Sequence, residues 1–215
     1  MVVSASSGVL DHPDLKERMS IDWADEHGKI IDLSEKFYKE REITLDCWLK
    51  ADGEIDFMTK MLDFQQLFDV AGLLQLRIEI DPNKPLVYMV YLDKGVAIKK
   101  KWRSGTMVGT FQLKLVEPEP FKMVIEAGKL PSYYTVINFT ITSSKPLTIY
   151  WNGTPYMSSQ IQDKISYYNN LNQPETFNFS YPLQKIYYPV ITGDISAISG
   201  DLQISAFSKI LWNKL

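Results

Sequence analysis

Apolar and polar residues alternate most clearly between positions 42 and 49, and this pattern predicts a strand with one buried face. Successive side chains of a strand point to opposite sides, so the apolar residues of this stretch share one face. They are Ile43, Leu45, Cys47 and Leu49. The strand follows a turn at Gly28 and is the longest regular alternation in the first half of the chain.

A helix is predicted over residues 54–71, after the Asp52-Gly53 break and before Gly72. Its apolar residues recur at spacings of three and four, which is the period of an amphipathic helix. They are Phe57, Met61, Phe64 and Phe68, and Met58, Leu62 and Leu67 widen them into one broad stripe. This stripe could pack against a sheet or line a ligand pocket, and we favour packing against a sheet.

Further strands are predicted between turn-forming residues throughout the chain. In the first half they are expected at 19–23, 73–80, 86–92, 96–103 and 108–116, with a tight hairpin at Asp93-Lys94-Gly95. In the second half they are expected at 133–142, 147–151, 161–168, 176–181 and 186–192. The tail, 200–215, is expected to hold a last strand and a short helical turn around Phe207, Ile210 and Leu211.

These elements predict a mainly β protein with one covering helix. Closely spaced prolines at Glu117-Pro118-Glu119-Pro120 cannot continue a strand or a helix, so a domain boundary is expected there. We expect a flexible N-terminal arm over 1–18, a split barrel or sandwich with its helix over 19–120, and an all-β sandwich over 121–215.

The charge balance argues against nucleic acid as a partner. Lys and Arg total 23 against 26 Asp and Glu, giving a net charge of −3. The only basic run, Lys99-Lys100-Lys101, could contact phosphates, but lysines at the edge of a sheet also prevent edge-to-edge aggregation, and we favour that role.

No metal, cofactor or membrane segment is expected. Cys47 is the only cysteine and lies in the apolar row of its strand, so a buried, inert thiol is predicted. His12 and His27 have no cysteine or spaced histidine beside them to form a zinc set. The chain has no long apolar run and no secretory signal at its start, so synthesis in the cytoplasm without membrane insertion is expected.

Three stretches in order resemble the distal tail protein family of long-tailed bacteriophages and prophages. They are the Gly28–Leu33 turn with Tyr38, Arg41 and the following strand, then the helix ending at Gly72, then Trp102–Pro120. The resemblance covers residues 19–120. It implies a virion structural protein of the tail tip or baseplate, assembled as a ring, usually a hexamer, with no catalysis. The implied partners are further copies of the chain and the tail tube, tape-measure and tail-tip proteins, joined in the virion tail after synthesis in the bacterial cytoplasm.

The second half resembles a polycystic-kidney-disease-type immunoglobulin-like sandwich, on the stretches 147–154, 177–181 and 187–195. That family usually has Trp-Gly-Asp-Gly where this chain has Trp151-Asn152-Gly153-Thr154, so the aspartate is missing and no calcium site is expected. The stretch 192–196 resembles the lead-in to leucine-rich repeats of gut Bacteroidetes proteins, which implies a truncated or minimal relative of such proteins.

An alternative function is a carbohydrate- or host-surface-binding module, because exposed aromatic rings can stack on sugars. The predicted contacts are Tyr150, Trp151 and Tyr156, although tyrosines that pack the sandwich would give the same composition. Enzymatic activity is not expected: acid pairs such as Asp22 with Asp25 and Asp194 with Asp201 occur, but no serine in the second half has a histidine near it in sequence.

Overall fold

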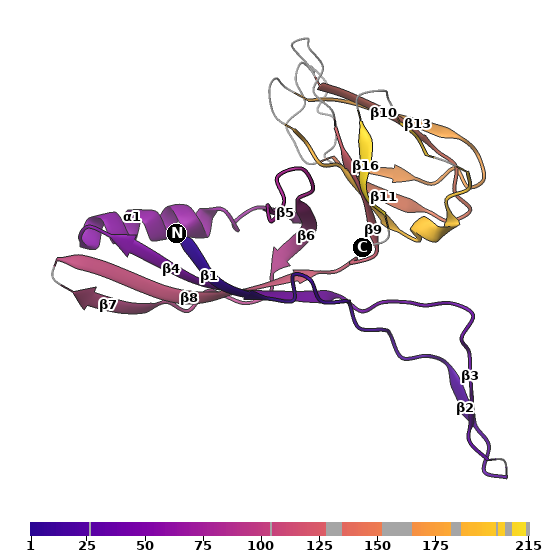
Figure 1. Cartoon of the computed structure of the whole chain (residues 1–215), viewed down its shortest axis with the longest axis horizontal. Coiled ribbons are helices and arrows are strands. Elements are labelled where there is room, and N and C mark those ends of the chain that lie inside the picture. Colours follow the sequence, from indigo (N-terminus) through magenta and orange to yellow (C-terminus); the bar gives the residue numbers. More distant parts are fainter. Residues whose placement is uncertain are drawn as a thin grey trace. The chain divides into compact units, whose positions relative to one another are not determined.

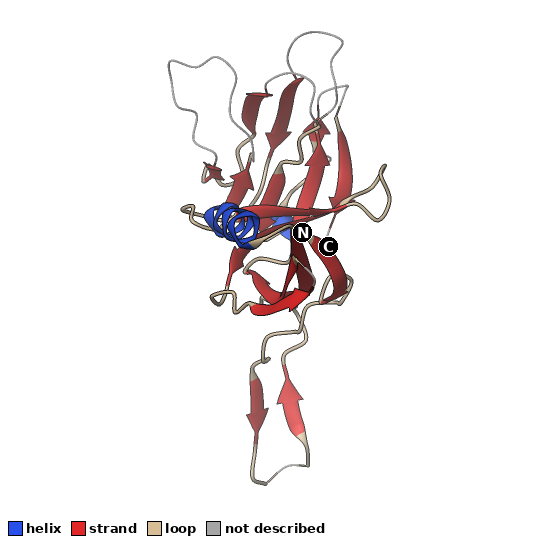
Figure 2. Ribbon diagram, turned by 90° about the vertical axis from the view of Figure 1, so that its left-hand side faces the viewer, coloured by secondary structure: helices blue, strands red, loops and turns tan. Residues whose placement is uncertain are grey.

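The computed structural model describes residues 1–25, 27–103, 105–127, 135–151, 165–181, 186–200, 202–204 and 208–213. Its regular structure is mostly strand with one α-helix among the described residues, so the predicted fold class is confirmed (Figures 1 and 2). The chain divides into two compact units. Unit 1 comprises residues 1–74 and 89–120, and unit 2 comprises residues 75–88 and 121–215.

The largest sheet has the strand order β1-β4-β8-β6-β5, and β7 also pairs with β8. The strands are β1 (Val2–Ser7), β4 (Arg41–Ala51), β5 (Leu74–Ile78), β6 (Leu86–Leu92), β7 (Lys99–Arg103) and β8 (Thr106–Glu117). β4 and β8 form the long antiparallel pair of unit 1, from Arg41 opposite Glu117 to Ala51 opposite Met107. The predicted alternation of β4 is confirmed, because every second residue from Arg41 to Ala51 is buried.

Helix α1 (Glu54–Gln66) covers the buried face of this pair with a narrower stripe than predicted. Phe57, Met61 and Phe64 are buried, and the Phe64 ring centroid lies 5.1 Å from that of Phe111 on β8. The residues expected to widen the stripe are exposed: Met58, Leu62 and Leu67. The helix also ends five residues before the predicted position, because the backbone tightens into i→i+3 hydrogen bonds after Gln66.

The tight hairpin predicted at Asp93-Lys94-Gly95 is wrong. Both β6 and β7 pair with β8 and not with each other. β6 pairs with β8 at Leu115 and Val116, and β7 pairs with it at residues 106–110. The segment between them therefore runs along β8 from one pairing site to the next. Turn-forming residues mark a break in regular structure but do not say which strands become neighbours.

The first residues, expected to form a flexible arm, include a strand that pairs with the main sheet. β1 pairs antiparallel with β4 over Val2–Ser7, with a register shift between Val3 and Ala5. All six residues of β1 are exposed, so no apolar alternation marked this strand in the sequence. Gly8 ends it at φ +79°, a conformation that glycine adopts without steric cost.

Unit 2 contains two sheets that face each other across a common core, as expected for a sandwich. One has the order β13-β10-β15 and the other β12-β11-β14-β9-β16. Their strands are β9 (Lys122–Glu126), β10 (Thr135–Ile141), β11 (Leu147–Tyr150), β12 (Ile165–Tyr168), β13 (Glu175–Tyr181), β14 (Val190–Gly193), β15 (Gln203–Ile204) and β16 (Lys209–Asn213). The core takes its largest side chains from both sheets and from residue 151: Phe139, Phe177, Phe179, Trp151 and Tyr168.

Two features of unit 2 differ from the prediction. β9 was not predicted, because four of its five residues are buried and it shows no alternation after the proline-rich segment. In the tail, Ile210 and Leu211 lie in strand β16 and not in a helical turn, because β16 pairs with β9. Phe207 lies outside the described residues.

Residues 75–88, predicted within the first domain, pack against strands of unit 2. The Trp212 indole N–H donates to the Pro85 carbonyl oxygen at 2.8 Å, and the Gln75 amide donates to the Tyr188 carbonyl oxygen at 2.8 Å. The buried Lys122 ammonium lies 4.3 Å from the centre of the Tyr88 ring, within the range of a cation–π contact. These contacts are made by polar and aromatic side chains far apart in sequence, which periodicity does not reveal.

Candidate assembly surfaces

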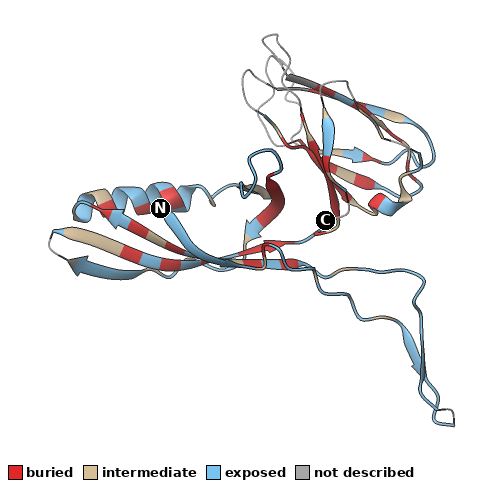
Figure 3. Ribbon diagram, viewed as in Figure 1, coloured by how far each residue is buried: buried red, intermediate tan, exposed pale blue. Residues whose placement is uncertain are grey.

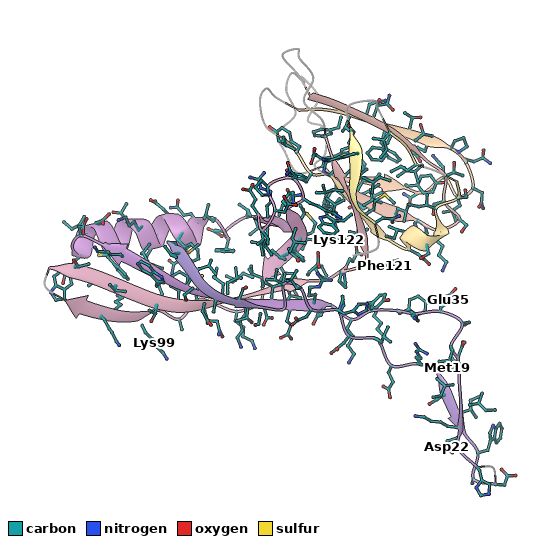
Figure 4. All side chains as sticks on the ribbon, viewed as in Figure 1. Met19, Asp22, Glu35, Lys99, Phe121 and Lys122 are labelled. Atoms are coloured by element: carbon teal, nitrogen blue, oxygen red, sulfur yellow. The ribbon has the colours of Figure 1, made fainter. Side chains whose placement is uncertain are left out.

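Residues 14–39 form an extended hairpin at the start of β4. Its strands β2 (Ser20–Asp22) and β3 (Lys29–Ile31) pair antiparallel, and the pairing continues toward the sheet through a bridge between Leu15 and Tyr38. Backbone hydrogen bonds from Lys16 to Phe37 and from Lys39 to Asp14, at 2.8 and 2.7 Å, close its base. Figure 4 labels Met19, Asp22 and Glu35 along this hairpin.

The extended hairpin exposes its apolar side chains. Every residue of β2 and β3 is exposed, and Met19 is 77% exposed (Figure 3). The other exposed apolar residues are Leu15, Ile21, Trp23, Ile30, Ile31, Leu33 and Phe37. A lone two-stranded hairpin is marginally stable in water, and an exposed apolar surface of this kind marks an interaction site.

A local turn orders one strand of the extended hairpin. The Asp32 carboxylate accepts hydrogen bonds from the Ser34 hydroxyl at 2.6 Å and from the Ser34 backbone N–H at 2.9 Å. These bonds stabilise the ionised carboxylate and lower the pKa of Asp32 below its ordinary value. The backbone N–H of Asp32 donates to Met19 across the hairpin at 3.1 Å, so the turn is tied to the pairing.

The basic strand β7 lies at the other end of unit 1. β4 is 11 residues long, so its two ends are separated by roughly 35 Å. The extended hairpin precedes the first residue of β4, whereas β7 pairs with the part of β8 that lies opposite the last residues of β4. β7 exposes Lys99, Lys100, Lys101 and Trp102. Figure 4 shows Lys99 at this end of unit 1 and Asp22 on the hairpin at the opposite end.

Helix α1 has a second apolar stripe on the side that faces away from the sheet. Ile55, Met58 and Leu62 follow one another at helical spacings of three and four, and Ile55 is 82% exposed. The buried stripe at Phe57, Met61 and Phe64 lies on the opposite side of the helix. Unit 1 therefore exposes apolar side chains on its helix as well as on the extended hairpin.

Arg41, Ile43 and Leu45, which belong to the stretch that resembles distal tail proteins, have structural positions in unit 1. Arg41 begins β4 opposite Glu117, and its Nε lies 3.8 Å from the Glu117 carboxylate in a buried ion pair. The Met89 backbone N–H donates to the other oxygen of that carboxylate at 3.4 Å. Ile43 and Leu45 point into the core. These residues therefore fix the junction of β4, β8 and β6.

The three predicted carbohydrate contacts have different positions in unit 2. Trp151 is 1% exposed, its indole N–H donates to the Ser166 hydroxyl at 2.8 Å, and its ring stacks on Phe179 with centroids 4.9 Å apart. Tyr150 is half-buried, and Tyr156 lies outside the described residues. Burial makes the Trp151 ring faces unavailable for stacking on a sugar, while contacts by Tyr150 and Tyr156 stay predictions.

Sequence reasoning predicted a strand at 19–23 and a turn at Gly28, but it missed the exposed surface of the extended hairpin. Its signal is a pair of short apolar runs, residues 19–23 and 30–33, on either side of a turn at Gly28, where φ is +83°. Such a pattern predicts a hairpin but not whether its apolar residues are covered by other parts of the chain. Only the fold shows that they are exposed.

Across the described segments, no group of three or more His, Cys, Asp or Glu side chains is placed to hold a metal ion. In the same segments, no helix has the length and apolar character needed to span a membrane.

No protein-family model matches this chain, and no curated protein matches it. One solved structure to which the chain is similar is the Dit (gp 19.1) protein of phage SPP1, described as a paradigm of the hub adsorption apparatus in phages that infect Gram-positive bacteria. The two sequences are 11% identical, the match covers 88% of this chain and 90% of that one, and the TM-score is 0.41.

Proposed function

We propose that this chain is a structural protein of a phage or prophage tail tip, a distal tail or baseplate ring component that assembles with copies of itself and catalyses no reaction. The observation that carries the proposal is the extended hairpin with its exposed apolar residues. Covering these residues with a neighbouring chain would offset the cost of holding the hairpin in one conformation.

The two ends of unit 1 are complementary in charge. β7 carries three consecutive lysines, and the tip of the extended hairpin carries Asp22 and Asp25, both exposed, with one lysine, Lys29, paired across from Asp22. A contact between the hairpin of one copy and β7 of the next joins two different surfaces. Such head-to-tail contacts close into a ring when the rotation between copies permits it. The exposed Trp102 beside the lysines gives the apolar hairpin residues a surface to pack on.

The resemblance of residues 19–120 to distal tail proteins supports the same function and extends it to partners. It implies that the ring binds the tail tube, tape-measure and tail-tip proteins, after synthesis in the bacterial cytoplasm. The second apolar stripe of α1, centred on Met58, is a surface that such partners could cover.

The oligomeric state of the purified 215-residue chain tests the proposal. Light scattering is expected to show a discrete species several times the 24.8 kDa of one chain. The double variant Trp23→Asp, Ile30→Asp places charges on the extended hairpin and is expected to be monomeric, because burial of the hairpin would then desolvate two carboxylates.

Leu171→Asp is the matched control, since it places the same charge on an exposed apolar residue of unit 2 and is expected to leave the oligomer intact. A wild-type chain that stays at 24.8 kDa at the highest attainable concentration would refute self-assembly. An oligomer that survives the double variant would refute the role of the hairpin.

A further inference from the structure

We infer that the extended hairpin of one copy docks on a shelf of the next copy, formed by Met58 and Leu62 of α1 and Trp102 of β7. α1 and β7 lie at the same end of unit 1 (Figure 1). The inference rests on the proposed function and deepens it, because it names the residues that accept the hairpin. It assigns this side of α1 to a second copy of the chain and not to another tail protein.

A contact between α1 and β4 shows which side of the helix borders β7. The Lys60 ammonium donates to the Lys50 carbonyl oxygen of β4 at 3.4 Å, so the Lys60 side of the helix faces β4. Successive residues of an α-helix are about 100° apart, so Met58 and Leu62, each two residues from Lys60, lie on the other side. Because β4 and β7 flank β8, that side faces β7. Met58 is 62% and Leu62 55% exposed.

The floor of the shelf is the face of β7 on which α1 lies. Lys100 pairs with Gly109, and its ammonium lies 5.7 Å from the centre of the Phe57 ring beneath the helix. Trp102 is two residues further along β7 and therefore shares this face. It is 54% exposed, so α1 leaves its ring uncovered. Apolar side chains of the helix and of the strand thus border one uncovered strip.

The shelf is about one strand wide. β7 is the described strand that lies beyond β8 at this end of the sheet, since β6 pairs with β8 at Leu115 and Val116. Neighbouring strands are roughly 4.8 Å apart. A helix with its side chains is roughly 10 Å across. An extended strand therefore fits the shelf, whereas a helix would overhang its edge.

One face of the extended hairpin matches the shelf. Met19, Ile21 and Trp23 are two residues apart along its first strand, so they share a face, and Ile30 lies opposite Ile21 on its second strand. All four side chains are exposed. Their row spans roughly 13 Å of strand. The exposed stripe of α1 spans roughly 10 Å of helix, so the two apolar rows have similar lengths.

The charges favour a second copy as the occupant. The floor of the shelf carries the exposed Lys100, and the described residues at the hairpin tip carry two carboxylates, Asp22 and Asp25, against one lysine, Lys29. Docking of the apolar row therefore brings opposite net charges together. The hairpin of the same copy begins at the other end of β4, roughly 35 Å away, so the contact joins two copies.

Cysteine cross-linking of the 215-residue chain tests the contact. The chain carries Ile21→Cys and Met58→Cys in a Cys47→Ala background and is treated with a short bis-maleimide. The two sites lie at opposite ends of β4, so a cross-link joins different copies. A ladder of covalent multimers is expected on a denaturing gel. The controls are each single-cysteine chain and the pair Ile21→Cys with Leu171→Cys, which are expected to give no ladder.

Substitution of one leucine gives a second test. Leu62→Asp is expected to weaken self-association at least about tenfold, because a leucine contact is lost and a carboxylate is desolvated. Leu67→Asp is the matched control, since Leu67 is 62% exposed and, seven residues from Lys60, lies on the β4 side of the helix. It is expected to associate as the wild type does. Sedimentation measures association, and circular dichroism verifies that both variants are folded.

The outcomes separate the shelf from ring assembly. An oligomeric wild type whose cysteine pair gives no ladder would refute the shelf and leave ring assembly standing. Equal association of Leu62→Asp and Leu67→Asp would also refute the shelf and would mean that another protein covers this side of α1. An equally strong ladder from the Leu171 pair would show random collision and would count against the contact. A monomeric wild type that gives no ladder would refute both ring assembly and the shelf.

Discussion

Cys47 shows how one side chain of β4 is controlled by its surroundings. It lies in the buried row of the strand, and its thiol donates a weak hydrogen bond to the Leu45 carbonyl oxygen at 3.7 Å. Burial raises the pKa of Cys47 above the ordinary value of 9.0, with a smaller contribution from the Asp46 carboxylate. The predicted inert thiol therefore has a buried position and a suppressed thiolate form.

We predict that Cys47 reacts with a thiol reagent at pH 8 at least about a hundredfold more slowly in the native chain than in urea, because reaction requires opening of the sheet. A raised thiol pKa also means that the folded state holds its proton more tightly than the unfolded state. The stability from this group is present below pH 9 and is lost as the pH rises through the folded-state pKa.

Timed absorbance assays with a chromogenic disulfide reagent measure the rate, and urea titrations at pH 8 and pH 10 measure the stability. Cys47→Ala serves as the control for the pH dependence. Rapid native labelling, or an equal fall in stability for the wild type and Cys47→Ala, would contradict this account.

Other single residues show where local pattern predicts an environment and where it does not. The period-two alternation of apolar residues alone predicted that Ile43 and Leu45 are buried, and both are buried. Arg41 and Glu117 are buried as well, which hydropathy could not predict, because a charged residue is buried only when its partner arrives from a distant strand. Trp151 was expected at a binding surface. Inside the core, its ring instead stacks on Phe179 and its N–H donates to the Ser166 hydroxyl.

Among the elements, the contact between α1 and β8 depends on one glycine. A Cβ atom at Gly109 would lie 2.8 Å from two ring atoms of Phe57, closer than side-chain atoms approach in folded proteins. Phe57 is buried beneath the helix and cannot move outward without displacing α1. The absence of a side chain at Gly109 therefore sets how closely α1 packs on β8.

Gly109→Ala is expected to destabilise unit 1 by about 1–3 kcal/mol, the usual cost of overpacking a core. Gly95→Ala is the matched control, since its added Cβ meets nothing within 4 Å. That variant is expected to be neutral or to gain up to about 1 kcal/mol, because alanine restricts the unfolded chain. Urea unfolding followed by circular dichroism gives both values, and equal stabilities of the two variants would show that the contact has no energetic role.

At the same scale, elements with strong local signals were predictable and those defined by distant pairing were not. β4, α1 and β6 carry regular patterns or clear boundaries and were found near their predicted positions. β9 and β16 depend on each other, so neither shows in its own sequence. The candidate surfaces follow the same rule: the lysines of β7 were predicted at a sheet edge, but the exposure of the extended hairpin depends on what the rest of the chain leaves uncovered.

For the whole molecule, the complementary charges at the two ends of unit 1 give a test of which surfaces meet. Lys99 and Lys101 lie on one face of β7, because they are two residues apart in a strand. Lys99→Glu with Lys101→Glu places two negative charges opposite Asp22 and Asp25 and is expected to abolish self-association. Adding Asp22→Lys and Asp25→Lys restores opposite charges and is expected to restore the oligomer.

Sedimentation at low and high salt measures both outcomes. The wild-type oligomer is expected to weaken as salt screens the contact, since the charges are exposed. Lys145→Glu with Lys209→Glu is the control, because it changes the net charge equally at exposed residues of unit 2 and leaves both the extended hairpin and β7 unchanged. If the fourfold variant does not form the oligomer although both double variants are folded, the self-contact lies elsewhere.

Residues 75–88 impose an order on synthesis. The ribosome completes this segment before it makes the unit 2 strands that the segment packs against, and Trp212, which bonds Pro85, follows 127 residues later. Until then the segment lacks its final partners, so unit 2 can complete its fold only after Trp212 has been translated. A chain interrupted before Trp212 would lack the indole that donates to Pro85, so the late part of unit 2 holds a segment made much earlier.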